Sequence, residues 1–160
     1  MIEEYKFIVD QNTGKVARWL RMMGFDTRLF TGDNDGDMVN IALKEKRILI
    51  TRDTRIMERR LVTGGQVRAI LVHSDQPEAQ VEQVLKTLKI RKSVLHPFSL
   101  CIECNQPLKK VSKEEIKDLV PPYVYLTQHQ FVQCPLCHRI YWQGTHWESM
   151  THKIESLGVE

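Results

Sequence analysis

The sequence predicts an α/β fold in which a doubly wound, mostly parallel sheet is followed by a small C-terminal module. Two observations carry this prediction. Short apolar runs of the strand type alternate four times with helical patterns across residues 5–88, an order that produces parallel strands with helices on both faces. All four cysteines then follow as two Cys-x-x-Cys pairs. We therefore expect two domains, residues 1–97 and residues 98–160.

The predicted strands are short, apolar and rich in branched residues. They cover residues 5–9, 27–31, 47–51 and 68–72. Runs of this length suit buried strands better than helices. In a sheet wound in this way every strand ends at the same edge, and ligands bind there, where the strand order reverses.

Helical patterns fill the segments after these strands. One helix is expected over residues 14–23, with Gly24 as its stop, a second opens within residues 33–37, and a short third covers about residues 54–61. Pro77 begins the last of these helices. The residues expected on their apolar faces are Val16, Leu20, Met23, Val39, Ala42, Leu43, Val81, Val84, Leu85 and Leu88.

Composition is that of an ordinary globular protein. Of the 160 residues, 42% are hydrophobic and 27% charged, which suits one core of normal size with a small satellite and excludes a disordered chain. No apolar run approaches the roughly 18 to 20 residues of a membrane helix, and Glu3 and Glu4 stand where a secretory signal would be basic. We expect a soluble, cytoplasmic protein with no membrane contact.

The two cysteine pairs are the most specific motif of the sequence. Cys101 and Cys104 are separated by 29 residues from Cys134 and Cys137. Two such knuckles supply four thiolates, the full tetrahedral coordination of a structural zinc ion. Disulfides are less favoured in a reducing compartment, and two independent redox dithiols are the alternative. His138 could replace one ligand, although four thiolates already suffice.

Acidic residues follow each of the four predicted strands. They are Asp10, the cluster of Asp33, Asp35 and Asp37, then Asp53, and Asp75. At one sheet edge these carboxylates would repel each other unless a cation neutralised them, and magnesium or manganese suits oxygen ligands. Asp is also common after strands as a turn former or helix cap. That structural interpretation fits Asp37 and Asp75 better than Asp10 and Asp53.

The sequence lacks the loops that cradle nucleotide phosphates. Residues 9 and 16 are valines, so Gly14-Lys15 belongs to no Walker A loop, and no G-x-G-x-x-G occurs. An acidic metal cluster without such a loop points to hydrolysis of a phosphodiester, for which one or two metal ions activate water and steady the leaving oxygen.

Basic residues surround the acidic positions. Residues 1–98 hold 17 Lys and Arg against 13 Asp and Glu, and the chain has a net charge of +3. The residues placed to contact a nucleic-acid backbone are Lys15, Arg18 and Arg21, spaced three apart on one helix, and Arg52, beside Asp53. Such contacts add affinity but do not distinguish one nucleotide sequence from another. A solvated helix face is the alternative.

Several of these motifs together resemble one known family. The stretches DQNTGKVARWLRMMGFD (residues 10–26), ILITRD (residues 48–53) and IYWQGTH (residues 140–146), with the two knuckles, are similar to the Mut-seven C-terminal RNase family. The resemblance covers nearly the whole chain. It implies a PIN-like nuclease domain with a C-terminal zinc ribbon, divalent-metal-dependent cleavage of RNA, and a homodimer, because PIN-like domains often dimerise.

The resemblance also implies roles for individual residues. The strand-end aspartates of the family fall on Asp10 and Asp53, and its acidic position at the start of the second helix falls on Asp37 or Asp35, where the register is open. Of the acidic positions, Asp75 is the one that the resemblance supports least.

Aromatic residues of the C-terminal module offer a second surface for RNA. Trp142 and His146, with Trp147, could stack on unpaired bases. They could equally form the small core of the module, which is the interpretation we favour for Phe131 and Tyr141.

Two hypotheses of different classes follow. In the first, Asp10, Asp37 and Asp53 bind magnesium or manganese and the protein is an endoribonuclease. In the second, the aspartates only form turns, and the protein is a non-catalytic RNA-binding adaptor that uses its zinc ribbon and basic face.

Overall fold

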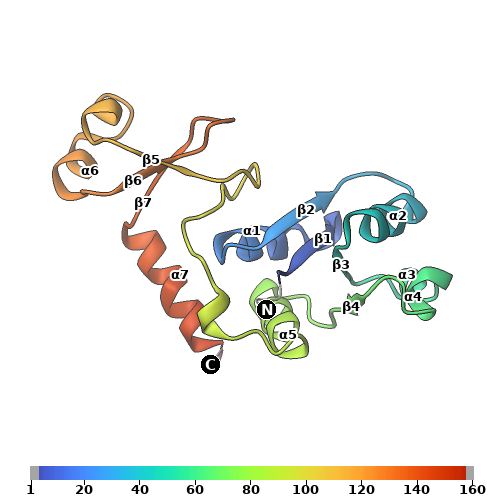
Figure 1. The fold of residues 1–160 in the computed structure, drawn as a ribbon. Helices are drawn as coiled ribbons and strands as arrows, with labels where there is room; N and C mark the ends of the chain where they lie inside the picture. Colours follow the sequence, from blue (N-terminus) through green and yellow to red (C-terminus); the bar gives the residue numbers. More distant parts are fainter. Residues whose placement is uncertain (1–3, 158–160) are drawn as a thin grey trace.

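A computed structural model of the chain describes residues 4–157, except the side chains of Thr145, His146, Trp147 and Met150. The first sheet contains β1 Lys6–Asp10, β2 Asp26–Phe30, β3 Ile48–Thr51 and β4 Ala69–Leu71. The helices beside it are α1 Gly14–Met22, α2 Asp35–Glu45, α3 Thr54–Met57, α4 Arg60–Thr63 and α5 Pro77–Thr87, with 3₁₀ turns at Gln11–Thr13 and Lys92–Val94 (Figure 1).

The four strands are all parallel and lie in the order β2-β1-β3-β4. The order reverses between β1 and β3, so the predicted doubly wound sheet is confirmed. Each predicted strand matches its observed strand to within one residue at either end. The carboxyl ends of β1 and β3 therefore lie side by side at the switch point, the usual ligand site of such sheets.

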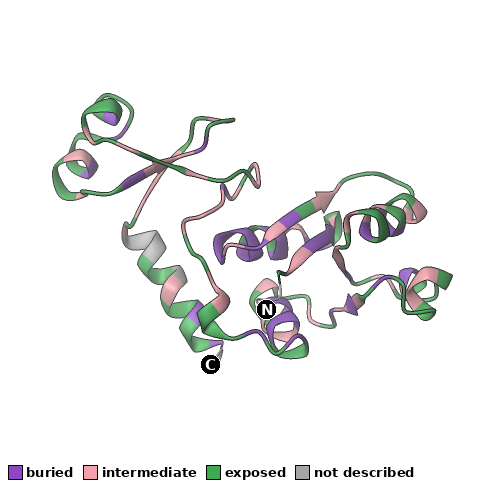
Figure 2. Ribbon diagram, viewed as in Figure 1, coloured by how far each residue is buried: buried purple, intermediate pink, exposed green. Residues whose placement is uncertain are grey.

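Alternation along the strands sends apolar side chains into two separate cores. Phe7 and Val9 of β1 pack in one cluster with buried residues of α1 and α5. Ile8, between them, packs in the other with Met38 of α2 and Ile56 of α3. Neighbouring residues of a strand point to opposite faces, so helices cover both sides of the sheet, as predicted. Figure 2 shows buried residues along the strands and on α1 and α5.

Two local predictions were wrong. The single helix expected over residues 54–61 is two short helices, because Arg59 is extended, with φ −62° and ψ 140°, and so separates α3 from α4. Leu43 is 43% exposed. The buried residues of α2 are Met38, Val39 and Ala42. At about 100° per residue this stripe is centred near Ala42, and Leu43 lies about 40° beyond Val39, outside the stripe.

Gly24 ends α1, as predicted, and the next segment depends on it. Its φ is +95°, and a Cβ added there would lie 2.4 Å from the carbonyl oxygen of His96. The backbone N–H of His96 in turn donates to the carbonyl oxygen of Met23 at 2.8 Å. The chain that leaves α5 therefore passes directly against the end of α1.

The cysteine module, residues 98–142, is built on a second sheet. Its strands β5 Lys109–Val111, β6 Phe131–Gln133 and β7 Ile140–Trp142 are antiparallel. A 3₁₀ turn, Glu114–Ile116, and α6 Pro122–Thr127 lie between β5 and β6. Ile116, Val120, Val124 and Phe131 form its own buried cluster, which confirms Phe131 as a core residue.

The last helix, α7 Thr145–Ser156, leads from the cysteine module back to the first sheet. Ile154 and Leu157 are buried in the core that contains α1 and α5, and Lys153 Nζ lies 3.0 Å from Glu78 of α5. The domain boundary at residues 97 and 98 stays a prediction, since the chain after it contributes to the first core. Among residues 4–157, no helix combines the length and the apolar character needed to cross a bilayer.

Candidate metal centre and acidic sheet edge

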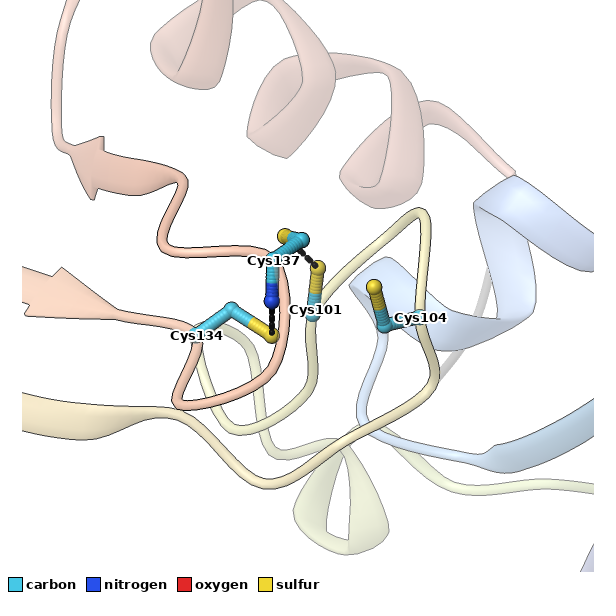
Figure 3. A group of neighbouring side chains, drawn as sticks. All are labelled: Cys101, Cys104, Cys134 and Cys137. Atoms are coloured by element: carbon cyan, nitrogen blue, oxygen red, sulfur yellow. Dashed lines mark hydrogen bonds between the residues drawn. The ribbon is translucent and has the colours of Figure 1, made fainter.

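The two cysteine knuckles fold alike and face each other. In the first, the N–H of Asn105 donates to the carbonyl of Cys101 at 2.9 Å; in the second, the N–H of His138 donates to that of Cys134 at 3.0 Å. Asn105 and His138 both have left-handed φ values, 60° and 65°. Each knuckle thereby turns its two thiols inward, toward the thiols of the other knuckle (Figure 3).

The four sulfur atoms fit one tetrahedral ion. All Sγ atoms lie within 4.8 Å of one another, and those of Cys101 and Cys137 are 3.7 Å apart. Bonds of about 2.3 Å from zinc to sulfur give a tetrahedron edge of about 3.8 Å. None of the four forms a disulfide, and exposed His138 is not part of the cluster. The cysteines are close enough to bind a metal ion, and the arrangement is consistent with structural zinc.

Hydrogen bonds around the sulfurs favour negative charge on one of them, Cys137. The backbone N–H of Arg139 and its guanidinium lower the pKa of the Cys137 thiol to about 6. The Cys137 thiolate in turn raises the pKa of Cys104 to about 12. The hydroxyl of Tyr141 lies 3.1 Å from Cys101 Sγ. Tyr141, expected in the module's core, is thus also a polar neighbour of a sulfur, a contact that the sequence did not indicate.

A buried polar contact joins the first knuckle to the first sheet. Arg21 is only 9% exposed. Its Nε donates to the carbonyl of Thr27 at 2.9 Å, and its Nη1 donates to that of Ile102 at 2.8 Å and of Glu103 at 3.3 Å. Burial is the main cause that lowers its pKa. Arg21 was predicted to contact RNA, but its guanidinium lies inside the protein, so it leaves the set of phosphate-binding candidates.

Asn105 completes this contact. Its side-chain oxygen accepts the N–H of Thr27 at 3.0 Å, and its Nδ2 donates to Asp26 at 2.7 Å. Burial acts to raise the pKa of Asp26, but hydrogen bonds from Arg47 and Asn105 outweigh it and lower that pKa. The residue that shapes the knuckle therefore also fixes the knuckle on β2.

Asp10 and Asp53 meet at the switch point through a third residue. The hydroxyl of Thr51, the fully buried last residue of β3, donates to Asp10 Oδ2 at 3.1 Å and accepts the backbone N–H of Asp53 at 3.0 Å. Thr51 was not predicted from the sequence. The feature that could have indicated it is a polar residue at the end of a buried strand, two positions before Asp53.

The carboxylate of Asp53 is held by Arg55. It accepts the backbone N–H of Arg55 at 2.9 Å, as the N-cap of α3, and its two oxygens accept from the guanidinium at 3.1 and 2.9 Å. These side-chain hydrogen bonds lower the pKa of Asp53. The charge of Asp35 also raises the pKa of Arg55, so the guanidinium lies in the field of two carboxylates of the edge.

The other acidic candidates line the same edge. Asn34 caps α2, since its side chain accepts the N–H groups of Gly36 and Asp37 at 2.8 and 3.3 Å. Asp35 is then half-buried and Asp37 exposed in the first turn. Asp75 is exposed in the turn after β4, and Ser74 accepts the N–H of Gln76 there at 3.0 Å. The topology places all five aspartates, Asp10, Asp35, Asp37, Asp53 and Asp75, at the same edge.

This edge is more open than the cysteine centre. Within residues 4–157, only the four cysteines form a group of three or more metal-binding side chains whose ligand atoms lie within 4.8 Å of one another. Lys15 and Arg52 are exposed beside the edge. Arg18 is exposed further along α1 and is ion-paired with Glu103. Trp142 is half-buried, with its ring 6.4 Å from that of Phe131; the side chain of His146 lies outside the described residues.

Comparison with known proteins identifies one family. The family model described as Mut7-C RNAse domain matches residues 5–154 of the 160-residue chain. Searches of curated proteins and of solved structures found no significant match to this chain. The family match confirms the resemblance stated from the motifs, and because it covers nearly all of the sequence, the chain belongs to the Mut7-C RNase domain family.

Proposed function

We propose that this protein is a divalent-metal-dependent endoribonuclease that cleaves RNA at the acidic sheet edge. Membership of an RNase domain family supports a ribonuclease-type function with RNA as its substrate. The observation that carries the location is the pair Asp10 and Asp53, joined through Thr51 at the switch point of a parallel sheet. In this proposal residues 1–97 are a PIN-like domain, and residues 98–160 contain a zinc ribbon held by the four cysteines.

The proposed metal ligands are Asp10, Asp53 and an acidic residue at the start of α2, Asp37 or Asp35. Magnesium or manganese, when bound, would lower the pKa of water and offset negative charge on the phosphate. The chain's own part is positional. Thr51 orients the carboxylate of Asp10, and Asp53 would exchange its contacts with the Arg55 guanidinium for the ion.

Two exposed cations flank the edge and are suited to the RNA backbone. Lys15 lies in the first turn of α1, which follows Asp10 after a single 3₁₀ turn, and Arg52 directly precedes Asp53. Arg18, one turn further along α1, would continue the same path. Phosphate contacts of this kind hold the strand without reading its sequence.

The test is a cleavage assay on labelled single-stranded and structured RNA with and without added magnesium or manganese. Omission is preferable to EDTA, which would also strip zinc. An Asp10→Ala/Asp53→Ala variant should lose at least about a thousandfold in rate, or about 4 kcal/mol of transition-state stabilisation. Asp118→Asn, at an exposed position of the cysteine module, is the matched control. Full activity in the double variant would refute the proposal.

One observation favours the second candidate, a non-catalytic RNA-binding adaptor. Asp53 caps α3 and has both oxygens on Arg55, which is the contact set of a purely structural aspartate. The adaptor predicts RNA binding without turnover, unaffected by magnesium or manganese. The same assay separates the two candidates, because only the nuclease shortens the RNA.

A further inference from the structure

A cleft with aromatic walls lies between α1 and the cysteine module. Its volume is about 550 Å³, and the residues that line it include Arg18 and Met22 of α1, Tyr123 of α6, and Tyr141 and Trp142 of β7. We call this space the aromatic cleft. Its size falls in the usual range for small-molecule sites, so it can accept a group as large as a nucleobase.

The aromatic side chains of the cleft differ in what the fold needs from them. The ring of Trp142 packs against the module's core, with its centroid 6.4 Å from that of Phe131. Tyr123 is 70% exposed, whereas its neighbour Val124 is buried in the module's core. The fold thus places a large aromatic ring at the cleft without using it for packing.

A second cavity adjoins the aromatic cleft and extends to the start of α1. It has a volume of about 850 Å³ and lies between α1, α5 and α7. Three residues, Arg18, Met22 and Ile102, line both cavities. Lys15 lines the second cavity at the start of α1, close in the chain to Asp10. The two cavities therefore lie next to each other along α1, from Lys15 in its first turn to Trp142 of β7, and we call them together the path along α1.

The charges along this path suit an anionic strand. The two acidic residues that line the second cavity are both ion-paired with lysines, Glu78 with Lys153 at 3.0 Å and Glu82 with Lys86 at 2.6 Å. Lys15 has no ion-pair partner among the residues that the structure describes. Exposed cations such as Lys15 beside aromatic walls are the combination that binds unpaired nucleotides, since phosphates contact the cations and bases stack on the rings.

We propose that the aromatic cleft binds one unpaired base of the RNA, with Tyr123 and Trp142 as its stacking partners. Arg18 would exchange its exposed ion pair with Glu103 for the phosphate of that nucleotide. This inference rests on the proposed function and deepens it. From Lys15 to Met22, α1 rises about 10 Å, so the bound base lies a few nucleotides from the point of cleavage. The substrate class is then RNA that is single-stranded on one side of the cleaved bond.

The test measures affinity for short single-stranded RNAs that each lack one base at a different position. The zinc-loaded Asp10→Ala/Asp53→Ala protein is used, so that no RNA is cleaved. We expect loss of one particular base to weaken binding about tenfold. Tyr123→Ala should weaken binding of intact RNA by a similar factor and abolish the difference between intact RNA and the RNA that lacks that base. Tyr123→Phe should retain both. Leu126→Ala is the matched control, because Leu126 is 72% exposed on the same helix and does not line the cleft.

Three results would overturn the inference. Equal affinity for every RNA of the series is the first, and unchanged binding by Tyr123→Ala is the second. A change in oligomeric state with Tyr123→Ala, measured by light scattering while RNA binding is unaltered, would instead make the cleft an interface between copies. Cleavage by the wild-type protein is scored separately. The base site can fail while the nuclease stands, and a base site without cleavage would support the adaptor.

Discussion

At the scale of single residues, one hydroxyl organises the acidic edge. Thr51 is fully buried, and its Oγ1 both donates to Asp10 and accepts from the backbone of Asp53. A β-branched side chain has few accessible rotamers, so this hydroxyl holds the ends of β1 and β3 in a fixed relation. The carboxylate of Asp10 and the backbone of Asp53 are thus positioned by a residue that carries no charge.

Arg55 gives a prediction at the same scale. Its guanidinium occupies both oxygens of Asp53, where a bound divalent ion would compete with it. Arg55→Ala should lower the magnesium or manganese concentration for half-maximal cleavage by about two- to fivefold, the range expected from an exposed ion pair. Arg60→Ala, an exposed arginine of the neighbouring helix α4, should leave it unchanged. A higher metal requirement in Arg55→Ala would contradict this expectation.

Two arginines of α1 illustrate how position decides the role of a residue type. Arg18 and Arg21 are three residues apart, but Arg18 is exposed and Arg21 is buried against three carbonyl groups. A spacing of three predicts neighbouring positions on a helix, and this holds. The difference arises because Arg21 lies against backbone carbonyls of β2 and the first knuckle, whereas Arg18 pairs with the exposed side chain of Glu103.

At the scale of elements, helix ends carry most of the functional geometry. α2 begins at a cap made by Asn34, and α3 begins at a cap made by Asp53. Both helix starts lie on the sheet edge that gathers the aspartates. Positive helix ends favour nearby negative charge, so the starts of both helices suit the aspartates of this edge.

Gly24 gives a prediction for the end of α1. Gly24→Ala combines a left-handed φ of +95° with a Cβ 2.4 Å from the carbonyl oxygen of His96. Gly65→Ala is the matched control, because its φ is +83° but a Cβ there meets nothing within 4 Å. The control should lower the free energy of unfolding by about 1 kcal/mol. Gly24→Ala should lower it by at least about 1 kcal/mol more, as measured by urea denaturation. Equal costs would mean that the segment at His96 moves aside freely.

At the scale of the whole molecule, the cysteine module is fixed to the first sheet from two sides. Arg21 and Asn105 join the first knuckle to β2, and α7 returns Ile154 and Leu157 to the core beside α1. Both cavities along α1 lie between these attachments. The position of the module relative to the sheet therefore determines whether the path along α1 exists.

Removal of the metal tests this dependence. The module's buried cluster is small, and metal binding commonly supplies the folding free energy of such modules. On chelation, or in a Cys134→Ser variant, amide protection in β5, β6 and β7 should be lost while β1 and β3 stay protected, as measured by hydrogen exchange. Rebinding of zinc should restore protection in the chelated protein only. Uniform loss across both sheets would show that they unfold as one unit.

The sequence by itself determined the strands of the first sheet, the four-cysteine centre and the gathering of aspartates at one edge. These follow from local periodicity, ligand spacing and the common direction of parallel strands. Only the tertiary structure decided the partners: Arg55 on the carboxylate of Asp53, Thr51 on the carboxylate of Asp10, and Arg21 in the interior. Which side chain is covered depends on elements remote in the chain, such as the first knuckle and α7, and no local pattern of residues encodes that contact.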